Sequence, residues 1–89
     1  MQWRFNHKLH NIPQGKILRI ETLSPALVHW SDDGWHTVND AQTQDSGFGV
    51  YYVDLPSSDI SEDGEIIFTF YWINAKHWEG NDFNVQIKT

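Results

Sequence analysis

Tryptophans set among polar residues are the feature of this sequence best suited to chemistry at a surface. Segment 29–36, HWSDDGWH, places Trp30 and Trp35 on either side of an Asp-Gly turn. Segment 74–82, NAKHWEGND, places Trp78 in a loop of polar residues and glycine. Sugar rings have apolar C–H faces rimmed by hydroxyl groups, so a flat, rigid ring with hydrogen-bonding neighbours can bind them. These segments therefore favour a carbohydrate-binding surface.

The predicted site has stacking platforms and a hydrogen-bonding margin. Trp35 and Trp78 are the platforms, because one follows a tight turn and the other lies in a loop, and the loops of a sandwich gather near strand ends. Trp30 or Tyr71 would supply a third platform. The margin is expected to comprise Asp33, Lys76, His77, Glu79 and Asn81.

Each tryptophan also has a competing interpretation as a core residue. Trp30 shares a strand face with Val28, and Trp72 shares one with Phe68 and Phe70, so burial is favoured for these two rings. For Trp35 and Trp78 both interpretations stay open, and the predicted site requires both rings to be at least partly exposed on one face. An exposed ring can serve a sugar or another protein equally well, so the sequence leaves both kinds of ligand open.

The sequence lacks the constellations of a self-contained enzyme. A glycosidase needs two carboxyl groups flanking one bond, whereas the carboxylates here mostly lie in turns beside Gly, Ser or Asn, where solvated Asp is ordinary. There is no cysteine, no Gly-x-Ser-x-Gly motif and no glycine-rich phosphate loop. The five histidines have no diagnostic ligand spacing, and His29 and His36 are expected on an outer face. We expect no catalytic residue, no metal and no cofactor.

Charge and hydropathy exclude further classes of partner. The 89 residues carry twelve acidic and six basic side chains, and the net charge of −6 repels a phosphate polyanion. No apolar run approaches the ~18–20 residues of a membrane-spanning helix, and no signal peptide is evident. We therefore expect neither nucleic acid nor membrane as a partner. The chain is expected to be a monomer, and no feature indicates its compartment.

Short runs rich in β-branched and aromatic residues must position these side chains. Turn signals separate the runs: Asp33-Gly34 and Asp63-Gly64 are typical of hairpins, and Pro25 and Pro56 end runs because proline cannot donate to a ladder. Strands are predicted at residues 17–23, 27–31, 35–38, 49–55, 65–72 and 83–88, and a loop is predicted at 39–49.

The pattern of runs predicts an all-β fold. No segment repeats apolar residues at helical spacing for more than about two turns. Short strands at about 8–12-residue spacing predict one domain over residues 1–89, an immunoglobulin-like antiparallel β-sandwich of six to eight short strands. Segment 1–16 is expected to be an irregular or edge segment whose aromatic residues pack on the body. The period-2 alternation predicts a core that contains Phe68, Phe70, Val85 and Ile87.

Seven motifs in a fixed order carry a resemblance to a known family. They are WRFNHK at 3–8, LRIE at 18–21, ALVHWSxDGW at 26–35, TxDxGxG at 43–49, DLP at 54–56, FTFYW at 68–72 and WEGxDF at 78–83. Together they resemble the extreme C-terminal segment of bacterial glucoamylases (glucan 1,4-α-glucosidases). The predicted hairpin with Trp30 and Trp35 on either side of its turn also resembles small starch-binding β-sandwich modules. The resemblance implies a parent enzyme that releases glucose from α-glucan chain ends with two carboxylic acids of a separate α/α-barrel domain. This chain matches none of that catalytic motif.

Two functional hypotheses follow. The first is a non-catalytic module that binds α-glucan, as starch or maltooligosaccharide. The second is a structural domain whose aromatic residues pack against the catalytic domain of the parent glucoamylase without binding sugar.

Overall fold

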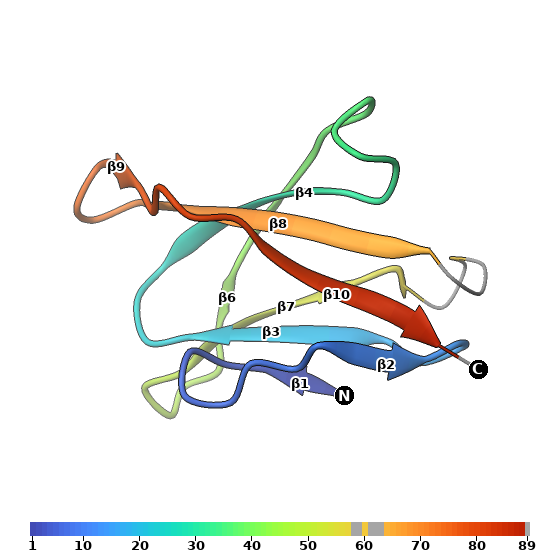
Figure 1. Cartoon of the computed structure of the whole chain (residues 1–89). Coiled ribbons are helices and arrows are strands. Elements are labelled where there is room, and N and C mark those ends of the chain that lie inside the picture. The colour runs from blue at the N-terminus through green and yellow to red at the C-terminus, as the bar shows by residue number, and fades with distance from the viewer. Residues whose placement is uncertain (58–59, 61–63, 89) are drawn as a thin grey trace.

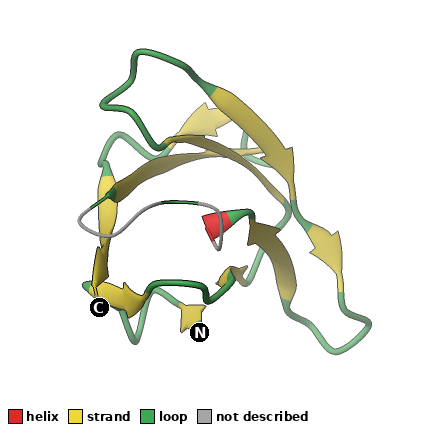
Figure 2. Ribbon diagram, turned by 90° about the vertical axis from the view of Figure 1, so that its right-hand side faces the viewer, coloured by secondary structure: helices red, strands yellow, loops and turns green. Residues whose placement is uncertain are grey.

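Strands make up nearly all of the regular structure. The computed structural model describes residues 1–57, 60 and 64–88 (Figure 1). Within them there is no α-helix, only a 3₁₀ turn at Ser57 (Figure 2), and no helix that could cross a membrane. The strands are β1 (Gln2–Trp3), β2 (Asn11–Pro13), β3 (Leu18–Thr22), β4 (Ala26–Ser31), β5 (Asn39–Gln42), β6 (Gln44–Asp45), β7 (Tyr51–Leu55), β8 (Glu65–Trp72), β9 (His77–Trp78) and β10 (Phe83–Lys88).

The strands form two packed sheets, which Figure 1 shows as two layers. One sheet has the order β1-β3-β7-β6, and the other has the order β2-β10-β8-β4-β5 with β9 paired to β8. With β9 set aside, naming the strands A, A′, B, C, C′, D, E, F and G in chain order gives sheets A-B-E-D and A′-G-F-C-C′. This is the arrangement of an immunoglobulin-like sandwich. The predicted fold class is therefore confirmed.

Two details of the sandwich differ from the prediction. The described residues contain ten strands rather than six to eight, because several pairings are only two or three residues long. The sheets are mixed rather than purely antiparallel, since β1 pairs with β3 and β2 pairs with β10 in parallel.

The core lies between the inner faces of the two sheets. The alternating burial of β8 and β10 places Phe68, Phe70, Val85 and Ile87 at 0% exposure, which confirms the predicted register. Opposite them, β3 contributes Leu18 and Ile20 through the same alternation. The predicted strands at 17–23, 27–31, 49–55, 65–72 and 83–88 agree with β3, β4, β7, β8 and β10 to within one or two residues.

The N-terminal segment is part of this core, as its aromatic residues predicted. Trp3 is 1% exposed, and its ring centroid lies 5.0 Å from those of Phe68, Phe83 and Phe5. All three contacts are edge-to-face, a favourable arrangement for aromatic quadrupoles. Phe5 lies at the edge of the cluster and is 37% exposed.

Two predictions between residues 32 and 49 are wrong. Residues 35–38 are not a strand, because the side chains of Ser31, at the end of β4, and Asp33 accept the backbone N–H groups of Trp35 and Thr37. Residues 39–49 are not one loop, because β5 and β6 lie there as polar edge strands. The chain passes from one sheet to the other at Thr43, whose backbone and hydroxyl both bond to Ala26. Asp63, in the turn predicted before β8, lies outside the described residues.

The docking of the first strand can be tested by removing its ring. Trp3→Ala leaves a cavity among aromatic residues and should lower the free energy of unfolding by about 3–5 kcal/mol. Phe48→Ala is the control, because Phe48 is 91% exposed and its loss should change stability by about 0.5 kcal/mol or less. Urea melts of both variants measure the difference. Equal stabilities would contradict the docked N-terminal segment.

Candidate functional site

The two predicted platforms meet on the outer face of the sheet that contains β4 and β8. His29 of β4 lies between them. The Trp35 ring stacks on the imidazole at 5.5 Å and 26°, and the Trp78 ring meets it edge-on at 5.3 Å and 74°. Tyr71 of β8 extends the row, 5.2 Å from Trp78. We call these four residues the aromatic strip.

The exposure of the strip agrees with the sequence prediction. Trp78 is 50% exposed and Trp35 is partly exposed, and both lie on one face because both contact His29. Of the two residues proposed for a third platform, Tyr71 joins the strip. Trp30 does not, because it points inward from β4 and is 8% exposed in the core. Its ring offers no free face to a ligand.

His29 is the site residue that the sequence did not reveal. It pairs across the sheet with Asp40 of β5 and Thr69 of β8. Its Nδ1 lies 2.6 Å from Asp40 Oδ1, so the carboxylate fixes the orientation of the imidazole and leaves Nε2 for other partners. Alternation along β4 predicts that His29 points outward. Its hydrogen bond to Asp40 could be predicted only from the register in which β5 pairs with β4. The polar residues of β5 gave no pattern from which to predict that strand.

Both loops that carry the indoles hold strained backbone. Trp35 has a φ of 71° and Lys76 a φ of 57°, and no other non-glycine residue of the described chain has a positive φ. A side chain in this left-handed conformation costs about 1–2 kcal/mol. Such conformations persist where the surroundings impose them, and they gather at ligand sites. The two strained residues therefore lie in the loops on either side of the strip, as is typical of a ligand site.

Asp33 organises the loop that carries Trp35. Its Oδ1 accepts the Ser31 hydroxyl at 2.6 Å and the Thr37 amide at 2.8 Å, while Ser31 Oγ accepts the Trp35 amide at 3.0 Å. The hydrogen bond from Ser31, followed by those from Thr37, lowers the pKa of Asp33 from 3.8 to about 2. This margin residue thus supports the platform through the backbone.

The other margin residues are divided between two sides of the β8–β9 hairpin. Trp78 pairs with Tyr71 and faces the strip, whereas His77 pairs with Trp72 and faces the other side. Glu79 also faces away, because its Oε1 accepts the Trp72 indole N–H at 3.2 Å. The prediction grouped these residues because it treated 74–82 as one loop without alternation.

Of the two remaining margin residues, Asn81 is the one that lies near the strip. Lys76 is exposed in the turn just before β9. The carbonyl of Asn81 accepts the hydroxyl of Thr69 at 2.8 Å, and Thr69 is the cross-strand neighbour of His29. The exposed Asn81 is therefore tied to the outer face of the sheet.

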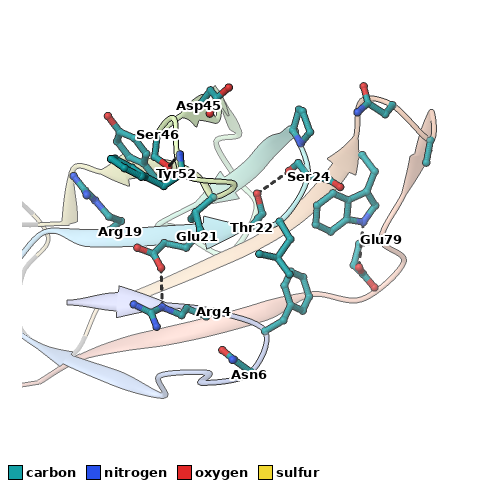
Figure 3. Close-up of a pocket in the computed structure, with 18 residues that line it drawn as sticks. Arg4, Asn6, Arg19, Glu21, Thr22, Ser24, Asp45, Ser46, Tyr52 and Glu79 are labelled. Carbon is teal, nitrogen blue, oxygen red and sulfur yellow. Dashed lines mark hydrogen bonds and ion pairs between the residues drawn. The ribbon is translucent and has the colours of Figure 1, made fainter.

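A separate groove of about 1070 Å³ follows the outer face of β3 and β7 in the other sheet and continues to the end of β8 (Figure 3). Its lining includes Glu21 and Tyr52 of that sheet, and Trp72 and Glu79 of the β8–β9 hairpin. The sequence did not predict it, because its walls come from segments far apart in the chain.

Neither a metal-ligand cluster among the described residues nor a match to a known protein indicates the function. Among residues 1–57, 60 and 64–88, no three His, Asp or Glu side chains are grouped to hold a metal ion. No protein-family model matches the chain, and no curated protein matches it either. Its function is therefore inferred from the strip and the groove.

The pKa of Asp33 makes loop stability depend on pH. Because the folded pKa lies below the unfolded one, the ionised carboxylate stabilises the fold above about pH 4, and this contribution is lost as pH falls through about 2. Asp33→Asn should therefore be less stable than the wild type at neutral pH, and the difference should close between about pH 4 and pH 2. Thermal melts across this range measure it.

Asp32→Asn is the matched control for that experiment. Asp32 is the preceding residue, and its carboxylate makes no hydrogen bond to any residue that the structure describes. Its stability difference should not close in acid. A pH-independent difference for Asp33→Asn would contradict the role given to its carboxylate.

Proposed function

We propose that this chain is a non-catalytic carbohydrate-binding module that holds α-glucan on the aromatic strip. The observation that supports it most is the placement of two partly exposed indoles on either side of one imidazole, on an outer sheet face. Trp35 itself has a strained backbone conformation, and the second strained residue, Lys76, lies immediately before β9, the strand that carries Trp78. Rings used only for packing would be expected inside the sandwich, where Trp3 and Trp30 lie.

The strip offers a sugar both stacking and hydrogen bonding. Stacking one ring on a glucose unit buries about 100 Å² of apolar surface and contributes roughly 2.5 kcal/mol before ordering costs. His29 Nε2 and the exposed Asn81 are polar groups near the stacking surfaces. Two platforms less the ordering costs give weak binding, with a Kd on the order of 10 μM to 1 mM.

The relative tilt of the indoles favours a coiled glucan. The imidazole lies within 26° of the Trp35 plane but 74° from the Trp78 plane, so the two indole planes are steeply inclined to each other. An α-1,4-glucan turns successive glucose rings along a coil, whereas a β-1,4-glucan presents a nearly flat ribbon. Inclined platforms suit the first shape.

A weak module is useful when it is tethered. The resemblance to glucoamylase C-terminal segments supports a module joined to a glycoside hydrolase. Binding would then keep the parent enzyme at a high effective concentration near its polymer. The carboxylates beside the strip favour this division of labour, because Asp33 and Asp40 are engaged with Thr37 and His29.

A second candidate function is structural packing against the parent catalytic domain. The observation that favours it is the exposure of Leu23 and Phe48, at 82% and 91%, along the groove rather than along the strip. The two functions use different surfaces, so one chain could perform both.

Removing either indole should separate binding from folding. Trp35→Ala and Trp78→Ala should each weaken binding to maltoheptaose by about 1–3 kcal/mol and change the free energy of unfolding by less than about 1 kcal/mol, since neither ring is in the core. Titration calorimetry and urea melts measure the two effects. Phe48→Ala is the control, because it removes an exposed aromatic ring outside the strip and should leave the affinity unchanged.

The opposite results would contradict sugar binding on the strip. If both variants bound maltoheptaose as the wild type does, the strip would not be the site. If each lost about 3–5 kcal/mol of stability, its ring would belong to the core.

The tilt of the platforms can be tested with a ligand of different shape. Maltoheptaose should bind at least about tenfold more tightly than cellohexaose, because only one ring of a flat oligosaccharide can stack on inclined platforms at a time. Competition by each oligosaccharide for binding to insoluble starch measures the ratio. Equal competition would contradict selection by curvature.

A further inference from the structure

The groove and the strip lie on different sheets. The strip covers the outer face of β4 and β8, whereas the groove runs along the outer face of β3 and β7. The two meet only at the β8–β9 hairpin, where Trp78 faces the strip and Glu79 faces the groove. A ligand on one surface therefore leaves the other accessible.

Apolar surface makes up most of the groove. Phe5, Tyr52 and Trp72 form part of its wall, and Figure 3 shows Tyr52 and Glu79 on opposite sides of it. At its rim stand Phe48 and Leu23, which are exposed by 91% and 82%. Apolar side chains exposed to this extent around one groove are typical of a protein contact surface. A leucine also lacks the flat face on which a sugar stacks.

Phe48 is presented by an ordered loop. Gly47 and Gly49 on either side have φ values of 85° and 82°, a conformation that glycine adopts without strain. The Gly47 amide donates to Asp45 Oδ1 at 2.8 Å, and the Phe48 amide donates to Ser46 Oγ at 3.2 Å. The loop thus holds an apolar ring in solvent, as an anchor residue requires.

The charges of the groove are not balanced. Both of its arginines are held in ion pairs with carboxylates. These pairs are Arg4–Glu21 at 2.7 Å and Arg19–Asp54 at 2.8 Å. Asp45 and Glu79 also line the groove, and neither forms an ion pair with any residue in the described part of the chain. Each accepts one N–H donor, so carboxylate oxygens remain for a cation.

We propose that the groove docks a protein segment in which apolar residues are flanked by lysine or arginine. The apolar residues cover Phe48, Leu23 and Trp72, and the cations pair with Asp45 and Glu79. A neutral glucan supplies no such cation. The net charge of −6 attracts the same kind of partner at long range. This inference does not depend on sugar binding by the strip.

Two matched peptides test the proposal. The probes are acetyl-Lys-Leu-Phe-Leu-Lys-amide and the same peptide with Glu in place of Lys, each titrated into the ¹⁵N-labelled chain, with maltoheptaose as a third arm. The Lys peptide should shift the amides of Phe48 and Leu23 and the Trp72 indole N–H in a saturable way. The Glu peptide should bind about tenfold more weakly, and added salt should reduce that preference.

Three variants locate the contact. Phe48→Ser should weaken binding of the Lys peptide about tenfold. Glu79→Gln keeps an acceptor for Trp72 but removes a charge, so it should narrow the preference for the Lys peptide. Ile17→Ser is the control, because Ile17 is 47% exposed but lies outside the groove lining, and it should leave the affinity unchanged. Retained amide dispersion in each spectrum shows that the variant is folded.

Several results would overturn the proposal. They are the absence of saturable shifts with the Lys peptide, equal affinity for both peptides, and binding that Phe48→Ser does not weaken. Maltoheptaose shifts at Phe48 and the Trp72 indole would instead make the groove a sugar site. Maltoheptaose shifts at the strip alone leave the docking proposal standing.

Discussion

The pleat of β4 is the constraint on which the strip and the core both depend. Val28 and Trp30 point into the sandwich, where they are 0% and 8% exposed, so His29 between them must point outward. Burial of the inner residues fixes this register, because a slip by one residue would exchange the two faces. The position of the imidazole, and with it the meeting point of Trp35 and Trp78, is thus set by packing on the opposite face of the strand.

The indoles are placed by loops that the core could not specify by itself. Asp33 and Ser31 wrap the loop around the Trp35 backbone, and the turn at Lys76 returns the chain so that Trp78 pairs with Tyr71. Positive φ at Trp35 and Lys76 costs conformational free energy, and the stability of the packed sheets offsets this cost. A rigid sandwich that bears strained loops gives a preorganised surface, and preorganisation lowers the ordering cost of a weak ligand.

Features that depend on side-chain alternation and turn residues could be predicted from the sequence. Features that depend on which strands pair, and in which register, could not. Period-2 patterns predicted β8 and β10 to the residue, and loop chemistry predicted the exposed indoles. His29 was missed as a site residue because its partner Asp40 lies on a polar edge strand without a hydrophobic pattern. Glu79 was predicted beside Trp78 but faces the opposite side of the hairpin. The two-residue pairing of β9 with β8 makes successive side chains point to opposite sides, which a loop prediction does not include. The groove depends on contacts between distant segments, which no local pattern encodes.

The most direct test of the strip is a titration of the ¹⁵N-labelled chain with maltoheptaose in which the five indole N–H signals are followed. Sugar binding on the strip predicts saturable shifts for Trp35 and Trp78. It predicts little change for Trp3 and Trp30, which are buried, and for Trp72, which faces the groove. The absence of shifts at Trp35 and Trp78, or shifts confined to Trp72, would contradict it.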